Sequence, residues 1–277
     1  EFLDGRRFSR VLIDEATQAT EPAALVPLVR GARQIVLVGD HRQLPPTVIS
    51  QRAKNGGLSR SLFERMVEVG ISPHLLRIQY RMHPAISAFP NERFYNGRLE
   101  DGVEASDRIT PAGLLWPDWE CPIAFLPIKG GEVRSPDGTS KENPTEASWV
   151  AQLLEGLMNG GELRQDDIGI ITPYAGQVRA IRDSVPTRYD EVEVRTVDGY
   201  QGREKEVILF SCVRSNSQGN VGFLSDSRRL NVALTRAKRG LIVIGDPETL
   251  RYDEDWAAWL EHVRSRNLEA WHLLGMA

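Results

Sequence analysis

Two short stretches of the sequence place carboxylates directly after apolar runs. Asp14 and Glu15 end the run VLIDE, and Asp40 ends the run IVLVGD. Carboxylates at the end of a buried strand can hold Mg²⁺, mostly through water, while a second carboxylate orients an attacking water. The residue types therefore suggest hydrolysis of a nucleoside triphosphate, with Asp14 serving the metal and Glu15 serving the water.

Gln43 follows Asp40 within the stretch GDHRQLPP. Its neutral amide can donate to a phosphate oxygen and accept from a water, which suits a sensor of a terminal phosphate. Simpler interpretations exist for both stretches. Asp14 and Glu15 could cap the next helix, and GDHRQLPP could be a polar turn that its prolines make rigid. The residues alone leave both interpretations open.

Three later stretches offer further groups for a nucleotide or a nucleic acid. Tyr80 and Arg81, in IQYRMHP, provide a flat ring for a base and a forked cation for a phosphate. Gly202 and Glu204 belong to the glycine-punctuated turn of TVDGYQGREKE, directly before an apolar run. In RRLNVALTRAKRG, cations that include Arg236 surround an apolar face. Alternatively, Tyr80 could be a core aromatic residue. Arg81 and the cations around Arg236 could be solvated surface charges instead of arginines aimed at a γ-phosphate.

Five short runs rich in Val and Ile, without alternation, indicate parallel strands buried on both faces. They lie at residues 11–14, 35–40, 168–172, 207–213 and 241–246. Helical patterns lie between them, at residues 58–70, 143–158 and 226–238; in the first, Leu58, Leu62 and Val69 recur on one face. Strands that alternate with helices predict an α/β fold. Residues 96–143 are rich in Gly, Pro and Asp, which predicts loops around one strand, IAFLP.

The overall composition is that of a globular protein, with 41% hydrophobic and 26% charged residues. The net charge of −4 means that any nucleic acid would have to be held by a local patch. No apolar run approaches the roughly 18 residues of a membrane-spanning helix, so no membrane partner is expected. Cys121 and Cys212 lack metal-ligand spacing. We interpret both as reduced thiols, which favours a cytoplasmic or nuclear location.

Six motifs occur in one order along the chain: VLIDEATQATEP, VGDHRQLPP, QYRMHP, GIITPYAGQ, TVDGYQGREKEVI and GFLSDSRRLNVALTRAKRG. Together they resemble superfamily 1B helicases of the nonsense-mediated mRNA decay type, the regulators of nonsense transcripts. The resemblance covers essentially the whole chain. It implies RecA-like parallel sheets flanked by helices, as in P-loop NTPases and helicases, with a partial domain at residues 1–75 and a complete one at 76–277. The implied activity is ATP- and Mg²⁺-dependent 5′-to-3′ movement along single-stranded RNA in mRNA surveillance.

The resemblance also implies roles for individual residues. Asp14 and Glu15 match the pair that serves magnesium and water, and Gln43 matches the γ-phosphate glutamine. Arg81 and Arg236 match two arginines that reach the γ-phosphate from the second domain. The other implied positions are Tyr80 at the adenine, Glu204, Gln201 and Gly202 at the nucleotide, and Thr172, Pro173, Tyr174 and Thr196 along the nucleic acid.

One family motif does not occur in the 277 residues: the phosphate-cradling loop G-x-x-x-x-G-K-[ST]. The chain is therefore expected to work together with a missing N-terminal part of its own polypeptide. Two alternatives stay open. The chain could belong to a DNA helicase of the same superfamily, or it could be a non-catalytic docking module for nucleic acid or protein.

The lysine and the backbone N–H groups of that loop carry most of the binding of the β- and γ-phosphates. We therefore expect this chain alone to bind Mg²⁺–ATP weakly or not at all, and not to hydrolyse it. Isothermal titration of the chain with Mg²⁺–ATP measures this directly. Binding in the low-micromolar range would contradict the expectation.

Overall fold

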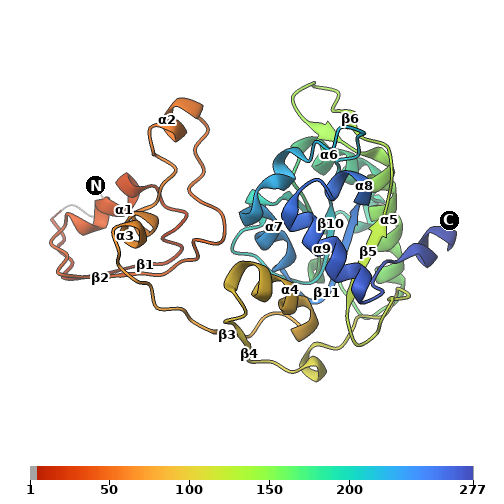
Figure 1. Ribbon diagram of the computed structural model, residues 1–277, viewed down its shortest axis with the longest axis horizontal. Helices are drawn as coiled ribbons and strands as arrows, with labels where there is room; N and C mark the ends of the chain where they lie inside the picture. Colours follow the sequence, from red (N-terminus) through yellow and green to blue (C-terminus); the bar gives the residue numbers. More distant parts are fainter. Residues whose placement is uncertain (1–4, 277) are drawn as a thin grey trace. The chain divides into compact units, whose positions relative to one another are not determined.

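The computed structural model describes residues 5–276, which separate into two compact units between Leu76 and Arg77 (Figure 1). The first unit contains a parallel pair of strands, which the first two apolar runs predicted, with a helix between them in sequence. Its elements are β1 (Arg10–Ile13), α1 (Glu21–Leu28), β2 (Gln34–Leu37), α2 (Gln51–Asn55) and α3 (Leu62–Glu68).

Two expectations for the first unit are wrong. Helix α3 begins at Leu62 and not at Leu58, because Ser61 and Glu64 form a capping box: the Glu64 N–H donates to the Ser61 hydroxyl at 3.1 Å. Strands β1 and β2 are not buried on both faces, since Leu12 is 67% exposed. Two strands and short helices, which are all that the described part of this unit supplies, cannot cover both faces of the pair.

The second unit is built on a five-stranded sheet in which every pairing is parallel. The predicted α/β fold with a parallel sheet is therefore confirmed. The predicted strands include its three central members and one outer member, and the remaining outer strand, β9, was not predicted. Across the sheet the order is β5 (Ile123–Pro127), β11 (Ala237–Gly245), β10 (Lys205–Ser211), β8 (Ile168–Thr172) and β9 (Glu193–Thr196).

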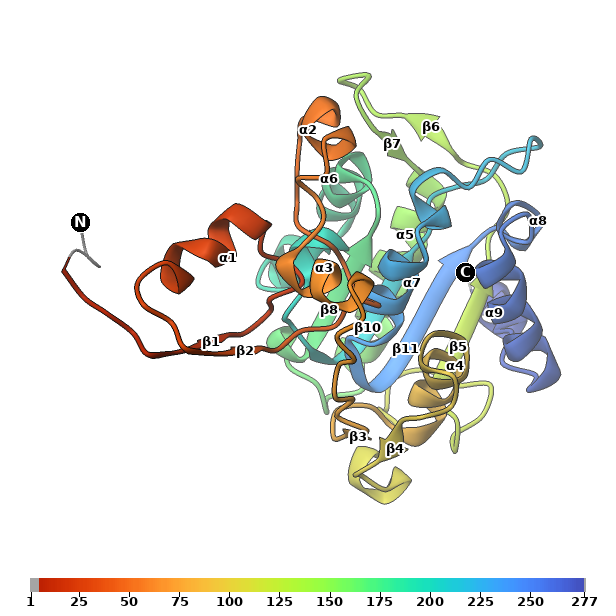
Figure 2. The same cartoon turned by 60° about the vertical axis from the view of Figure 1, so that its left-hand side comes forward.

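Helices cover both faces of this sheet (Figures 1 and 2). Successive side chains of β10 point to opposite faces of the sheet. Leu209 joins a core cluster with Leu154 of one helix layer. Phe210 stacks on Trp256 of the other layer, with ring centroids 5.9 Å apart. The first layer holds α5 (Pro144–Asn159) and α6 (Ala175–Ser184), and the second holds α4 (Pro84–Tyr95), α7 (Ser227–Leu234) and α9 (Glu254–Ser265). Among residues 5–276, no helix has the length and apolar character needed to cross a bilayer.

The remaining elements of the second unit are short. Strand β3 (Ile78–Gln79) pairs with β4 (Glu100–Asp101), and β6 (Val133–Arg134) pairs with β7 (Lys141–Glu142). Helix α8 (Pro247–Leu250) precedes α9. The segment predicted as loops around one strand thus contains β5 together with β4, β6, β7 and a 3₁₀ turn at Ala105–Arg108.

Strand β10 is followed by a sharp turn at Val213, which has φ 74 although it is β-branched and buried. Buried side chains from the start of α5 hold this conformation. Glu146 Oε2 accepts from the Val213 N–H at 2.8 Å and from the Ser211 hydroxyl at 2.6 Å, and Asn143 Nδ2 donates to the Val213 carbonyl at 3.1 Å. Burial raises the pKa of the Glu146 carboxyl to about 8, against the opposing effect of these bonds.

Glu146 should make the stability of the chain depend on pH. Folding raises the pKa of its carboxyl from 4.5 to about 8, so the folded chain keeps a proton that the unfolded chain releases. This contribution is complete below the lower value and is lost as the pH rises through the higher one. We expect the melting temperature to fall by at least about 3 °C between about pH 6.5 and about pH 9, and Glu146→Gln to remove most of that fall.

The matched control is Glu261→Gln, which changes an exposed carboxylate on α9. It should keep the pH dependence of the unaltered chain. The assignment to Glu146 fails if Glu146→Gln melts with the same dependence on pH as the unaltered chain.

Candidate nucleotide and nucleic-acid sites

Asp14 and Glu15 directly follow β1 in the first unit. Asp14 Oδ1 accepts from the Glu15 N–H at 2.9 Å, and Glu15 Oε2 accepts from Gln18 Nε2 at 2.5 Å. Glu15 has φ 49, a conformation that is uncommon outside glycine and that is found often at functional sites. The cap of α1 is Thr20, so Asp14 and Glu15 do not cap the next helix. That simpler interpretation is wrong.

Gln43 and Asp40 follow β2 at the same edge of the strand pair, because β1 and β2 run parallel. Gln43 Nε2 donates to Asp40 Oδ2 at 3.0 Å, and the Gln43 N–H donates to the Asp40 carbonyl at 3.1 Å. The Ala16 N–H donates to the Val38 carbonyl at 2.8 Å and ties the ends of the two strands together. These polar segments thus follow the two strands at one edge of the strand pair.

The carboxylates of the first unit restrict the kind of metal that could bind. Among the residues that the structure describes, no three His, Cys, Asp or Glu side chains gather as a metal site. Asp14 alone suits an ion such as Mg²⁺, which keeps several waters and takes other ligands from phosphate. Asp14 therefore fits a Mg²⁺ that arrives with a nucleotide.

Tyr80 presents its ring to solvent in the second unit and is 63% exposed. The ring lies against the backbone of Gly102, where an added Cβ would come 2.4 Å from Tyr80 Cε1. Two side chains fix the backbone of this segment. Gln79 Oε1 accepts from the Arg81 N–H at 3.0 Å, and Arg108 donates to the carbonyls of Tyr80 and Arg81, each at 2.8 Å. Tyr80 is thus a supported, exposed ring.

Arg81 is joined to Glu204, which lies 123 residues further along the chain. Its Nε donates to Glu204 Oε2 at 2.6 Å, and its Nη1 donates to the Thr235 carbonyl at 3.0 Å. Lys238 Nζ lies 3.2 Å from Glu204 Oε1. Burial raises the pKa of Glu204, but Arg81 and Lys238 outweigh it and hold that pKa below its ordinary value. In the described part of the chain, Arg81 Nη2 donates to no acceptor.

Arg236 lies beside this cluster but is buried. Its guanidinium donates to the carbonyl of Val232 at 3.1 Å and to the Thr235 hydroxyl at 2.9 Å. Thr235 therefore lies between the two predicted arginines, since its carbonyl accepts from Arg81. The structure brings Arg81, Arg236 and Glu204 together at the amino ends of β10 and β11.

Gln201 and Gly202 lie in the turn that leads to Glu204. Gly202 has φ 75, and the space where a Cβ would lie is open. A glycine is favoured here by the backbone conformation, and not by close contact with a neighbouring group. Gln201 Nε2 is buried and has no hydrogen-bond partner among the described residues. It is a donor that a ligand at this turn could use.

The predicted nucleic-acid positions lie at the opposite, carboxyl edge of the sheet. Thr172 and Thr196 are register partners at the ends of β8 and β9. Thr172, Pro173 and Tyr174 are buried, whereas Thr196 is partly exposed. Phe223, an exposed ring packed on Tyr174 at this edge, was not predicted from the sequence. Its place between a glycine and Leu224 in a known motif was the available signal.

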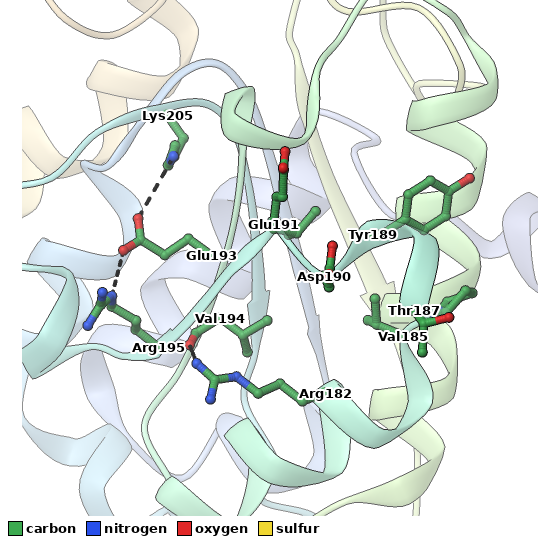
Figure 3. A pocket seen from close by; sticks show the side chains of 12 residues that line it. Arg182, Val185, Thr187, Tyr189, Asp190, Glu191, Glu193, Val194, Arg195 and Lys205 are labelled. Carbon is green, nitrogen blue, oxygen red and sulfur yellow. Dashed lines mark hydrogen bonds and ion pairs between the residues drawn. The ribbon is translucent and has the colours of Figure 1, made fainter.

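A cavity of about 580 Å³ lies along the outer strand β9 (Figure 3). Three of its charged side chains pair with one another: Glu193 accepts from Arg195 Nε at 2.5 Å and lies 3.8 Å from Lys205 Nζ. Arg182 Nη2 donates to the Val194 carbonyl at 3.2 Å. None of the predicted site residues lines this cavity, so it is separate from the predicted sites.

Two family models match the chain, and both are described as an AAA domain. They cover residues 58–248 and residues 1–51. The chain therefore belongs to this AAA-domain family.

Individual relatives define the class more closely. The chain is 46% identical over 276 residues to the Drosophila melanogaster protein "Regulator of nonsense transcripts 1 homolog", a match that covers 96% of this chain and 23% of that protein. It is 44% identical over 268 residues to the Saccharomyces cerevisiae protein "ATP-dependent helicase NAM7", with 94% and 28% covered. The chain thus spans about a quarter of the length of these relatives. The resemblance inferred from the six motifs is confirmed.

A solved structure of a helicase is also similar. The crystal structure of Arterivirus nonstructural protein 10 (helicase) matches with a TM-score of 0.46 and 16% identity, covering 90% of this chain and 42% of that chain.

Tyr80 is expected to support a nucleotide base through stacking. The test uses a fusion of this chain to the part of the Saccharomyces cerevisiae relative that precedes the matched region, so that a complete nucleotide site can form. Tyr80→Ala should weaken ATP binding about 5- to 50-fold, whereas Tyr80→Phe should keep it within about twofold. Titration with a fluorescent ATP analogue measures both.

Tyr252→Ala is the matched control, because Tyr252 is as exposed as Tyr80 but lies beyond α8. It should leave ATP affinity unchanged. Equal affinity in Tyr80→Ala and the unaltered fusion would rule out the stacking role.

Proposed function

We propose that the chain is the C-terminal motor portion of an ATP-dependent 5′-to-3′ helicase that moves along single-stranded RNA. The observation that carries this proposal is the arrangement around Arg81. Glu204 and Thr235 hold the guanidinium in place, Nη2 has no protein acceptor in the described residues, and the exposed Tyr80 ring is the preceding residue. The relative named as an ATP-dependent helicase supports ATP as the substrate.

Each group in the second unit suits one part of ATP. Tyr80 would stack on the adenine, and the turn that contains Gln201 and Gly202 would lie near the nucleotide. Arg81 and Arg236 would place positive charge at the γ-phosphate, where it compensates the charge of the transition state. The role of each of these residues at ATP is a prediction of the proposal.

Glu204 gives Arg81 a partner in the absence of phosphate. Its pKa lies below the ordinary value, so its carboxylate is charged at neutral pH and keeps the guanidinium in one orientation. A γ-phosphate could bind at Nη2 without breaking the Nε bond to Glu204. The positioning of the arginine would then precede the arrival of ATP, which lowers the entropic cost of organising it.

Residues of the first unit have the chemistry needed to bind a metal and to orient a water. Asp14 would hold a Mg²⁺, which neutralises phosphate charge when it is bound. Glu15, whose carboxylate is already oriented by Gln18, would accept a hydrogen bond from the attacking water. Gln43 is held by Asp40 and would sense the terminal phosphate.

The nucleic acid would be held mainly through phosphate and sugar, so binding should be tolerant of sequence and sensitive to salt. RNA is proposed because the names of several relatives, such as the Drosophila melanogaster protein, refer to nonsense transcripts. A DNA helicase of the same superfamily would carry similar catalytic residues, and a matched pair of RNA and DNA substrates distinguishes the two.

ATP hydrolysis by the same yeast fusion, measured with and without single-stranded RNA, tests the proposal. Arg81→Ala should lower the RNA-stimulated turnover at least about 100-fold, and Arg81→Lys should not restore it, because lysine cannot bind Glu204 and phosphate with one planar fork. Arg77→Ala is the control, since Arg77 is an exposed arginine that pairs only loosely with Glu100 at 3.6 Å.

Three results would count against the proposal. They are turnover that RNA does not stimulate, turnover that survives Arg81→Ala, and faster displacement of a DNA duplex than of a matched RNA duplex. The first two would reject the motor function, and the third would replace RNA with DNA as the substrate.

A further inference from the structure

Phe223 is an exposed phenyl ring in the second unit, in which the other exposed large rings belong to Tyr and Trp residues. It is 56% exposed, whereas Phe89, Phe125 and Phe210 are at most 4% exposed. Exposure of one large apolar group is common and needs no explanation by itself. The support beneath this ring is what distinguishes it.

Two neighbours hold the ring in place. Tyr174 packs against it with ring centroids 5.2 Å apart, and the Arg229 guanidinium lies 5.4 Å from its centroid. Arg229 is itself fixed, because it donates from Nε and Nη2 to the two carboxylate oxygens of Asp198, at 3.2 and 3.3 Å. The ring is therefore restrained from the side of the protein, while more than half of its surface stays open to a partner.

The backbone that carries the ring is also fixed. The Phe223 N–H donates to the Tyr174 hydroxyl at 3.2 Å, and the same hydroxyl accepts from Arg214 Nη1 at 3.3 Å. Gly222 has φ 57, and a Cβ there would come 2.1 Å from Arg214 Nη1 and 2.4 Å from the Tyr174 hydroxyl. Only glycine lets the chain approach this buried pair so closely.

The buried pair rests in turn on an ion pair. Arg214 Nε donates to Glu132 Oε2 at 3.0 Å, and both side chains are almost fully buried. Glu132 also binds Lys141 Nζ at 2.5 Å. Buried charges need such complete pairing, because each lost partner leaves an uncompensated charge. The position of Phe223 is therefore fixed by a chain of contacts that reaches the interior.

The location of the ring indicates what it could bind. Tyr174 follows β8, and Asp198, which holds Arg229, follows β9. The groups that support Phe223 therefore come from the carboxyl ends of both strands. Thr196, the partly exposed member of the predicted nucleic-acid positions, ends β9 at this same edge. An open aromatic face beside a path for a single strand suits an unpaired base, since every base has a π face.

We propose that Phe223 is a stacking platform for an unpaired base of single-stranded nucleic acid at the carboxyl edge of the five-stranded sheet. The proposal rests on the proposed function, because it assumes that a single strand crosses this edge. It adds a base contact to a grip that would otherwise be made to phosphate and sugar alone.

The test measures binding of fluorescently labelled single-stranded RNA to the 277-residue chain by anisotropy. Phe223→Ala and Phe223→Leu should each weaken binding about tenfold, because both lose the aromatic face, while Phe223→Tyr should stay within about twofold of the unaltered chain. The matched control is Trp119→Ala. Trp119 is 53% exposed and precedes β5, at the amino edge of the sheet, so its loss should leave binding unchanged.

A strand of the same length without bases separates stacking from backbone contact. The unaltered chain should bind it about tenfold more weakly than RNA, and Phe223→Ala should add no further loss. Melting curves of each variant check the fold; because the ring is exposed, Phe223→Ala should melt within a few degrees of the unaltered chain.

The outcomes separate this inference from the proposed function. If the unaltered chain binds RNA and Phe223→Ala binds it equally well, or loses as much affinity for the strand without bases, then the platform is wrong and the proposed function is untouched. If the unaltered chain binds no single strand at all, the platform is rejected, and the RNA-stimulated turnover of the yeast fusion decides the proposed function separately.

Discussion

The ion pair between Glu132 and Arg214 is the interaction on which the carboxyl edge of the second unit depends. Burial raises the pKa of Glu132, yet the hydrogen bonds from Lys141, Arg214 and the Asn216 side chain lower it to about 2, so the carboxylate stays charged. Arg214 can enter the interior only because the chain reverses at Val213, in a conformation that β-branched residues seldom adopt. The buried carboxyl of Glu146, which is mostly protonated at neutral pH, holds that reversal at Val213. The charged carboxylate of Glu132 binds the next residue, Arg214.

The amino edge of the same sheet follows the same principle with more exposed groups. Glu204 precedes β10, as Val213 follows it, and each end of this central strand carries an arginine held by a carboxylate. At the buried end, Arg214 positions the Tyr174 hydroxyl. At the exposed end, Arg81 keeps its Nη2 donor available. The parallel sheet, packed on both faces, separates the two edges at a fixed distance and keeps each network in register.

Much of this arrangement could be predicted from sequence, since continuous apolar runs mark the central strands and the pattern at 143–158 marks α5. The remainder depends on long-range contacts that no local pattern encodes. Arg81 and Glu204 are separated by 123 residues, and only the sheet order brings them together. Leu58 fits the helical period, but the capping box at Ser61 starts the helix later. Phe223 sits among apolar residues that pack inward, and its exposure follows from Gly222 rather than from its own type.

The outer strand β9 shows how the sheet ends on one side. At the other side, β5 is closed by the chain itself, because the Phe125 N–H donates to the Leu268 carbonyl and its carbonyl accepts from Ala270. Along β9, by contrast, Arg182 occupies the Val194 carbonyl, and Glu193 is surrounded by cations. An edge strand of this kind is a poor template for an added strand. Pairing would require the charged side chains to be desolvated and Arg182 to release the Val194 carbonyl. The fold thereby guards one flank against ordered aggregation of its own copies.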